Sequence, residues 1–190
     1  MLGVPKFLMA CLVIVASFLA TIPTTFADDF ASVEARLHEL GLTIPEPYES
    51  VANYVAAKRV GNLVFLSGHS ECEEPYITGK VGSDRTVAEG YEAARLTALC
   101  LLASLKAKIG DLDKVVQIVK VNGMVNATEG FKEHSKVMNG CSDLLIEIFG
   151  ERGRHARAAV GMASLPLNLT VEIEMIVEVT DEPAQVPESK

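Results

Sequence analysis

The segment 155–179, HARAAVGMASLPLNLTVEIEMIVEV, decides the fold more than any other part of the chain. Residues 156–164 are small or β-branched for the most part, and 165–168 contain a proline. Residues 169–179 alternate apolar side chains with threonine and glutamate. We therefore predict two strands joined by a turn, the second with one buried face and one acidic face.

A single arginine, Arg157, interrupts the apolar residues of the first strand. Burying a guanidinium is costly unless an anion meets it. If the two strands form a hairpin with its turn near 166–167, Arg157 lies roughly opposite Ile176, with Glu174 and Glu178 diagonal to it. Two partners are open: one of these glutamates, or a substrate carboxylate gripped through two parallel hydrogen bonds.

Outward from this segment, hydrophobic periodicity predicts the other elements. A short amphipathic helix is expected over 30–41, and residues 68–85 are expected to form a loop. The remaining elements are strands at 55–60, 63–67 and 115–125, a helix from the Thr86–Glu89 capping box to about Ile109, and a helix at 131–149. The order β-β-α-β-α-β-β is typical of an α+β sandwich with both helices on one face of a mixed sheet.

The N-terminal segment has the layout of a secretory signal peptide. Lys6 precedes an apolar stretch, and Thr25-Phe26-Ala27 places small residues at the positions before a cleavage site. The uncharged stretch 7–26 is also long enough to span a bilayer, so an uncleaved anchor is the alternative. We expect a secreted or periplasmic protein, attached to a membrane only if this segment is uncleaved. The expected organisation is a signal peptide (1–27), a helix and linker (28–50), one domain (51–179) and a flexible tail (180–190).

Composition narrows the function classes. The chain is 49% hydrophobic, which excludes disorder over most of its length, and its net charge of −8 disfavours nucleic-acid binding. Its four histidines show no metal-ligand spacing, so no metal site is expected. Cys72, Cys100 and Cys141 form an odd, widely spaced set that does not predict disulfides. Cys100 lies in an apolar helical run and is predicted to be a small buried side chain.

The runs 157–161 (RAAVG), Leu165-Pro166 and 171–174 (VEIE) together resemble the signature of the RidA/YjgF family, also known as endoribonuclease L-PSP-like proteins. Tyr54, thirteen residues before Ser67, and an asparagine in the second helix fit the same family in the same order. The resemblance covers roughly residues 51–179.

The resemblance implies a chorismate-mutase-like fold and a homotrimer with its sites in clefts between subunits. It also implies hydrolysis of small 2-imino acids or enamines to 2-oxo acids and ammonia, without metal or organic cofactor. By position, Arg157 binds the substrate carboxylate and Glu172 orients or activates the attacking water. The residues implied to line the substrate pocket are Tyr54, Ser67, Gly68, Asn139 and Ala159. Many members have cysteine at the position of Ala159, so no thiol role is expected here.

Two other functions are compatible with this resemblance. A trimer that holds a small carboxylate without turnover would use the same cleft. Ribonuclease activity is reported for some relatives, but the acidic chain and the lack of a histidine acid–base pair count against it.

Overall fold

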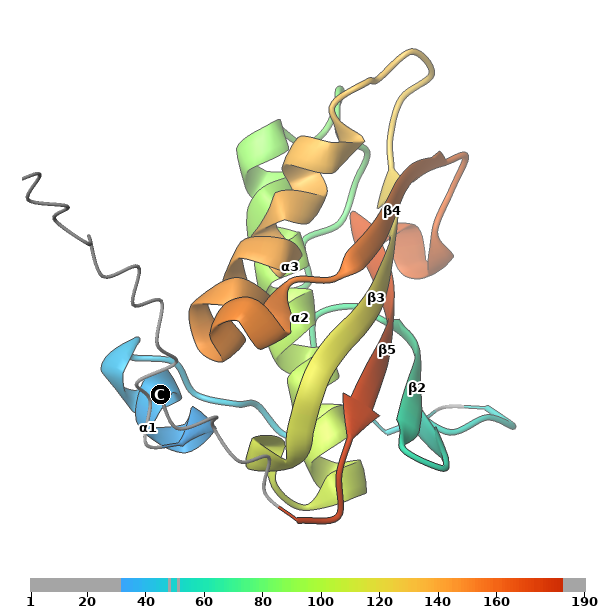
Figure 1. Cartoon of the computed structure of the whole chain (residues 1–190). Helices are drawn as coiled ribbons and strands as arrows, with labels where there is room; N and C mark the ends of the chain where they lie inside the picture. Colours follow the sequence, from blue (N-terminus) through green and yellow to red (C-terminus); the bar gives the residue numbers. More distant parts are fainter. Residues whose placement is uncertain (1–31, 48, 51, 183–190) are drawn as a thin grey trace, which may run out of the picture.

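The computed structural model describes residues 32–47, 49–50 and 52–182, so the expected signal peptide and most of the expected tail lie outside the described residues (Figure 1). The described chain folds into one five-stranded sheet with helices packed on it, an α+β architecture as predicted. The elements are α1 (Val33–Glu39), β1 (Ala57–Val60), β2 (Leu63–His69), α2 (Val87–Ile109), β3 (Val115–Asn126), α3 (His134–Phe149), β4 (Ala156–Met162) and β5 (Val171–Val179).

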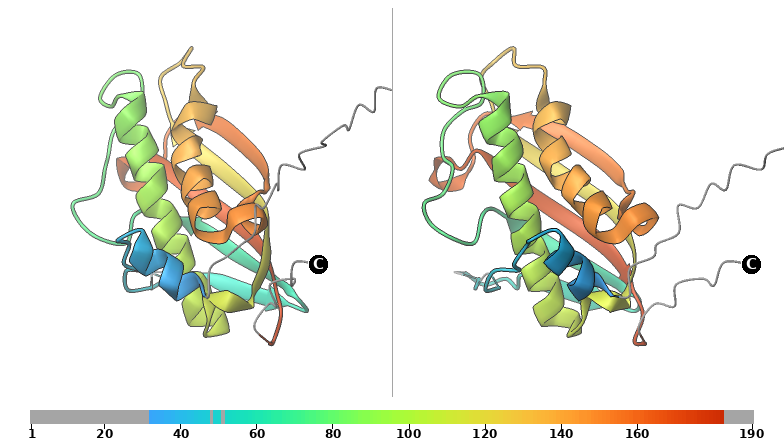
Figure 2. Two further views of the ribbon diagram at one scale, coloured as in Figure 1. Left: turned by 60° about the vertical axis from the view of Figure 1, so that its left-hand side comes forward. Right: turned by 90° about the vertical axis from the view of Figure 1, so that its left-hand side faces the viewer.

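The strand order is β1-β2-β5-β3-β4, with β3 and β4 parallel and all other neighbours antiparallel. The two long helices, α2 and α3, lie side by side over one face of the sheet, and no described helix covers the other face (Figure 2). We call these the covered face and the open face. The mixed sheet and the one-sided helices match the expected sandwich.

The expected hairpin between the last two strands is wrong. β4 pairs with β3, and β3 separates β4 from β5, so Arg157 aligns with Val121 of β3 rather than with Ile176. The connection between β4 and β5 contains a short 3-10 turn, Pro166–Asn168, whose last two residues have φ of 53° and 57°. This turn leads the chain past β3 to the sheet centre, where β5 pairs with both β2 and β3.

Local signals set the ends of the two long helices. The capping box predicted for α2 is present: Thr86 Oγ accepts from the Glu89 backbone N–H, and the Glu89 carboxylate accepts from the Thr86 N–H. Helix α3 begins at His134, later than predicted, because Gly130 at φ 84° extends the preceding turn. Phe131 lies in that turn and packs edge-on against the ring of His134.

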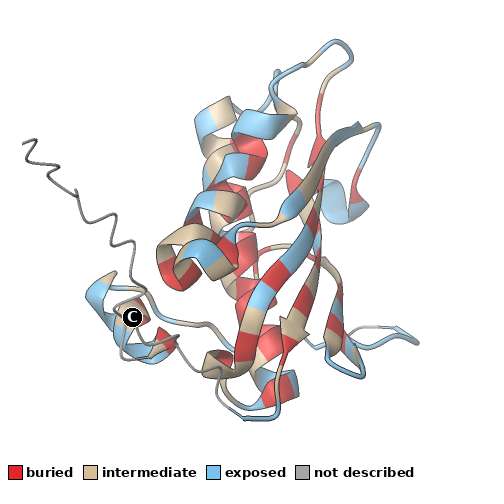
Figure 3. Cartoon of the chain, viewed as in Figure 1, coloured by how far each residue is buried: buried red, intermediate tan, exposed pale blue. Residues whose placement is uncertain are grey.

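The core lies between the sheet and the helices. Along β5, Val171, Ile173, Met175, Val177 and Val179 are buried on the covered face, as the alternation predicts. The residues between them lie on the open face, and Figure 3 shows this alternation along the strand. The open face also carries exposed apolar side chains, Val60, Phe65 and Val160. The two faces therefore differ in that only one of them is covered by the described chain.

The prediction that the cysteines form no disulfide is wrong. Cys72, in the loop after β2, is bonded to Cys100 of α2, with the two Cα atoms 5.5 Å apart. Cys100 is fully buried, as predicted, but as half of a disulfide, and Cys141 is the free cysteine of the described chain. Burial raises the pKa of the Cys141 thiol to about 12. The pairing was missed because spacing in sequence does not reveal that the loop returns to this helix.

Within residues 32–182, apart from positions 48 and 51, no helix is both long and apolar enough to cross a membrane.

Candidate functional site

Arg157 lies on the edge strand β4 and reaches α3. Its Nη1 donates to Asn139 Oδ1 at 3.0 Å and to Ser142 Oγ at 2.9 Å, and its Nη2 donates to the Ser135 carbonyl at 3.3 Å. These acceptors are spaced four and three residues apart, so they lie on one face of α3. All three groups that hold the guanidinium in the described part of the chain are neutral.

Neither glutamate considered as a partner for Arg157 neutralises it. Glu174 accepts from the Asn122 amide at 3.1 Å, and Glu178 accepts from Asn62 and Gln117. Among the described residues, Arg157 forms no ion pair and its Nε–H has no acceptor. The three hydrogen bonds leave the Nε–H and at least one Nη2–H for another ligand. A planar guanidinium presents two such donors to a carboxylate as a fork.

Glu172 is a half-buried carboxylate on the open face of β5. No described residue donates a hydrogen bond to it, and a Cβ added to Gly68 would lie 2.0 Å from Glu172 Oε1. Burial raises the pKa of Glu172, and the nearby charge of Glu174 raises it further. A partly desolvated carboxylate with a raised pKa can orient water and accept a proton from it.

A β-bulge brings Gly68 against Glu172. In the pairing of β2 with β5 the register shifts between Leu66 and His69, so Ser67 and Gly68 form the bulge. The ring of His69 anchors it: Nδ1 is 2.7 Å from the Ser67 carbonyl and Nε2 is 2.8 Å from Ser104 Oγ of α2. The short Gly68 therefore leaves the space that the Glu172 carboxylate occupies.

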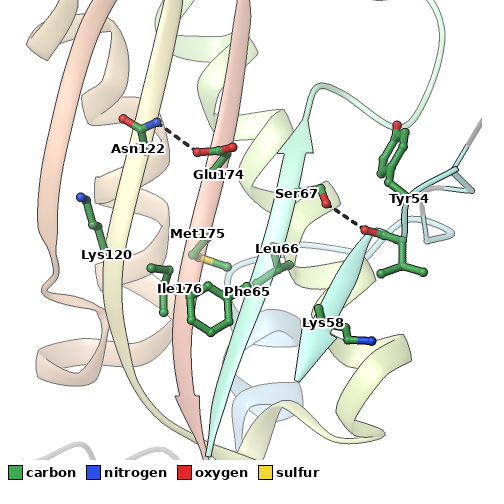
Figure 4. Close-up of a pocket in the computed structure, with 11 residues that line it drawn as sticks. Tyr54, Lys58, Phe65, Leu66, Ser67, Lys120, Asn122, Glu174, Met175 and Ile176 are labelled. Atoms are coloured by element: carbon green, nitrogen blue, oxygen red, sulfur yellow. Dashed lines mark hydrogen bonds between the residues drawn. The ribbon is translucent and has the colours of Figure 1, made fainter. Parts of the chain in front are cut away.

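Tyr54 and Ser67 line one pocket of about 610 Å³ on the open face (Figure 4). Tyr54 belongs to the segment before β1, and Ser67 lies at the end of β2, where its hydroxyl donates to the Val55 carbonyl at 2.8 Å. The floor is formed by side chains from the central strands, including Phe65, Asn122, Glu174 and Ile176. Neither Asn139 nor Arg157 lines this pocket.

The predicted site residues thus fall into two groups. One, the guanidinium half, consists of Arg157 and Asn139, with Ala159 two residues along β4 and packed against the core. The other, the carboxylate half, consists of Tyr54, Ser67, Gly68 and Glu172. Arg157 reaches the helix that covers the sheet, whereas Glu172 is on the open face, so one chain does not bring the two halves together.

Two residues of the guanidinium half, Ser135 and Ser142, were not predicted from the sequence. Their signal was available, because both share a helix face with Asn139 at positions four before and three after it. No group of three or more histidine, cysteine, aspartate or glutamate side chains in the described part of the chain is arranged to hold a metal ion.

The fold and this two-part site define the chain as an α+β protein of the chorismate-mutase-like class. The family model described as "YjgF/chorismate mutase-like, putative endoribonuclease" matches residues 34–179. The chain therefore belongs to the YjgF family, as the segment 155–179 predicted.

Relatives support this membership along most of the chain. Protein TCP17 of Trypanosoma cruzi is 41% identical over 152 residues, covering 78% of this chain and 95% of that protein. The crystal structure of Atu1372 from Agrobacterium tumefaciens, described as of unknown function, is 47% identical with a TM-score of 0.72, covering 78% of this chain and 92% of that one. The crystal structure of a protein from Shewanella oneidensis, described as a "putative endoribonuclease", is 37% identical with a TM-score of 0.74, covering 78% of this chain and 99% of that one.

Proposed function

We propose that the protein hydrolyses small 2-imino acids, or their enamine tautomers, to 2-oxo acids and ammonia. The observation that carries this proposal is the state of Arg157: the guanidinium is fixed by three neutral acceptors and keeps two N–H donors for an incoming carboxylate. A substrate with a carboxylate beside its reacting carbon fits this donor pair.

The reaction needs little beyond placement of a water molecule. Glu172 takes a proton from water as the water oxygen bonds to the iminium carbon, and the proton is passed to the nitrogen before the C–N bond breaks. As ammonia leaves, the Glu172 carboxylate takes the hydroxyl proton on that carbon, and the carbon becomes the carbonyl of a 2-oxo acid. The raised pKa of Glu172 suits a group that accepts and then returns a proton.

The separation of the two halves supports a site completed by a second copy of the chain. We infer that a homotrimer places the guanidinium half of one subunit beside the carboxylate half of its neighbour. Uncovered apolar side chains on the open face, such as Phe65 and Val160, provide surface for this assembly. Closed symmetric assemblies repeat one such contact at every interface.

Export is part of the proposal. A disulfide between Cys72 and Cys100 is typical of oxidising compartments such as the periplasm or the extracellular space. This agrees with the signal peptide expected over residues 1–27, and it supports a secreted or periplasmic enzyme.

The test is a coupled assay in which an amino-acid oxidase or a dehydratase supplies 2-iminopropanoate or 2-iminobutanoate. The purified protein should accelerate formation of the 2-oxo acid, and Arg157→Ala should remove most of the acceleration. Arg154→Ala is the matched control, because Arg154 is a nearby arginine whose guanidinium already pairs with Glu151.

Three outcomes contradict the proposal. Equal acceleration by Arg157→Ala would separate the activity from this site. A raised melting temperature with 2-oxobutanoate, lost in Arg157→Ala but without turnover, would indicate a carboxylate-binding protein. Cleavage of RNA by the same preparation, lost in Arg157→Ala, would assign the site to a ribonuclease.

A further inference from the structure

His155, next to β4, makes two hydrogen bonds that define its protonation state. Its Nδ1 is 2.7 Å from the Gly153 carbonyl, and its Nε2 is 3.0 Å from Ser142 Oγ. A carbonyl oxygen can only accept, so Nδ1 carries the proton. In the neutral ring Nε2 then accepts, which assigns the Ser142 hydroxyl proton to it.

The Ser142 oxygen is shared between this histidine and the guanidinium half of the site. Since its proton is given to His155, its lone pairs face outward, and one of them accepts from Arg157 Nη1 at 2.9 Å. The hydrogen bonds of this network therefore all run in one direction. Arg157 donates to Ser142, Ser142 donates to His155, and His155 donates to the Gly153 carbonyl. Burial lowers the pKa of His155, and the charge of Arg157 lowers it further, both of which favour the neutral ring.

We propose that His155, acting through the Ser142 hydroxyl, is a positioning residue that orients the Arg157 guanidinium for carboxylate binding. Asn139 and the Ser135 carbonyl also hold the guanidinium, but neither fixes the Ser142 hydroxyl. Without His155 the hydroxyl can rotate and turn its proton toward Arg157, where it repels the cation. His155 itself has no direct hydrogen bond to Arg157 among those the described chain makes.

The same arrangement occurs in the carboxylate half. His69 has its Nδ1 at the carbonyl two residues before it and its Nε2 at a helix serine, as His155 does. Each half of the site is thus attached to a different helix, α2 or α3, through a histidine and a serine. This repetition supports a positioning role over a chance packing contact for the pair at Arg157.

Two substitutions of His155 separate its two hydrogen bonds. His155→Gln places an amide at the Nε2 position and keeps the contact with Ser142, whereas His155→Asn places one at the Nδ1 position and keeps only the contact with Gly153. The inference rests on the proposed function, so the first readout is the KM for 2-iminobutanoate and the Kd for 2-oxobutanoate. His155→Asn should raise both by about five- to tenfold, and His155→Gln should stay close to the wild type.

Ser142→Ala provides the second arm. Alone it should weaken 2-oxobutanoate binding at least as much as His155→Asn does, because it removes the Arg157 contact as well as the His155 contact. The double variant should be no weaker than Ser142→Ala, because His155 acts only through the Ser142 hydroxyl. Equal losses in His155→Gln and His155→Asn, additive losses in the double variant, or unchanged binding in all three would each overturn the proposal.

A readout without ligand keeps this test independent of the proposed function. Nitrogen NMR of the wild type should show a His155 ring protonated at Nδ1 alone. It should also show restricted rotation of the Arg157 guanidinium that is lost in His155→Asn and kept in His155→Gln. If the wild type neither turns over imines nor binds 2-oxobutanoate, the proposed function fails, and these NMR signals decide the role of His155. Equal mobility of the Arg157 guanidinium in the wild type and all variants would then reject the positioning role of His155.

Discussion

The two faces of the sheet differ in what the chain itself provides for them. The covered face is closed by α2 and α3, and its side chains are almost all apolar and fully buried. The open face combines exposed apolar residues with the glutamates of β5, a lysine-lined pocket and the Glu172 carboxylate. The covered face accounts for folding of the single chain, whereas the open face leaves apolar side chains uncovered by the described chain, which are the surface for the proposed assembly.

This difference also separates the two halves of the site. The guanidinium half is built against a covering helix, where neutral acceptors fix Arg157. The carboxylate half lies on the open face, where Glu172 has no donor from the described chain. A positioned cation and an unpartnered carboxylate therefore occur on separate surfaces of one chain.

The largest effect is expected from Glu172→Gln, which tests the open face as the place of chemistry. The amide keeps the shape of the side chain but cannot accept a proton from water, so kcat for 2-iminobutanoate should fall by about 10²- to 10⁴-fold. Binding of 2-oxobutanoate should persist, because Arg157 is unchanged. Glu178→Gln, six residues along the same strand and face, is the control and should retain activity. Similar losses in both variants would show that the effect is not specific to Glu172.

A pair of isoleucines on β5 compares the two faces directly. Ile173 is fully buried on the covered face, and Ile176 is partly exposed on the open face. Ile173→Ala should lower the free energy of unfolding by about 2–5 kcal/mol, through lost burial and the cavity left behind. Ile176→Ala should lower the stability of the subunit by less than about 1 kcal/mol but weaken self-association.

Urea unfolding at several protein concentrations distinguishes these effects, because assembly makes apparent stability depend on concentration. Sedimentation or light scattering gives the oligomeric state. A large concentration-independent loss in Ile176→Ala would mean that the open face is covered within the subunit itself.

A disulfide ties α2, one of the helices over the covered face, to the loop after β2, and the structure shows no disulfide on the open face among the residues it describes. Removing the Cys72–Cys100 disulfide, by the double change to alanine or by a reductant, should cost about 2–4 kcal/mol of stability. Urea midpoints with and without reductant measure this. Cys141→Ala should keep the full response to reductant, since Cys141 is the free cysteine of the described chain. An unchanged midpoint of the wild type in reductant would contradict the prediction.

The smallest effect concerns pH and the two histidines that attach the site to α2 and α3. Burial lowers the pKa of His69 and of His155 from 6.5. As pH falls, the two histidines are therefore protonated at a higher pH in the unfolded chain than in the folded chain. Their contribution to stability is present above about pH 6.5 and is lost as pH falls toward their pKa values in the folded chain. The free energy of unfolding should be higher at about pH 7.5 than at about pH 5.5.

Raised pKa values at Glu71 and Glu172 act in the opposite sense, since protonation there favours the folded state. A variant isolates the contribution of His155. Between the two pH values, the free energy of unfolding of His155→Gln should fall by less than that of the wild type. An identical fall would assign the pH dependence to other groups.

Local patterns in the sequence predicted the elements well, because they arise from interactions within each element. The alternation of β5 identified its buried face, and Thr86 with Glu89 identified the start of α2. Strand pairing was not predicted correctly, because alternation shows which face of β5 is buried but not which strand lies beside it. The crossover at Pro166–Asn168 and the disulfide both depend on contacts between distant parts of the chain.

The site shows the same division. The resemblance to a family predicted a site made of Arg157, Glu172 and the residues around them. The structure shows a hydrogen bond between Arg157 and Asn139 and a close approach of Gly68 to Glu172. The sequence alone could not show that these two pairs of residues lie on separate surfaces. Ser142 was missed because a serine in a helix has no distinctive pattern until its partners are known.

Genetic complementation would follow from the placement of Arg157 and Glu172 on separate surfaces. In the proposed assembly, equal amounts of Arg157→Ala and Glu172→Gln chains that mix at random join one intact half from each parent at about a quarter of all interfaces, which is one interface in each mixed trimer. Two inactive alleles would then restore partial activity when expressed together. Conversely, a chain damaged in both halves would act as a dominant inhibitor of the intact subunits with which it assembles.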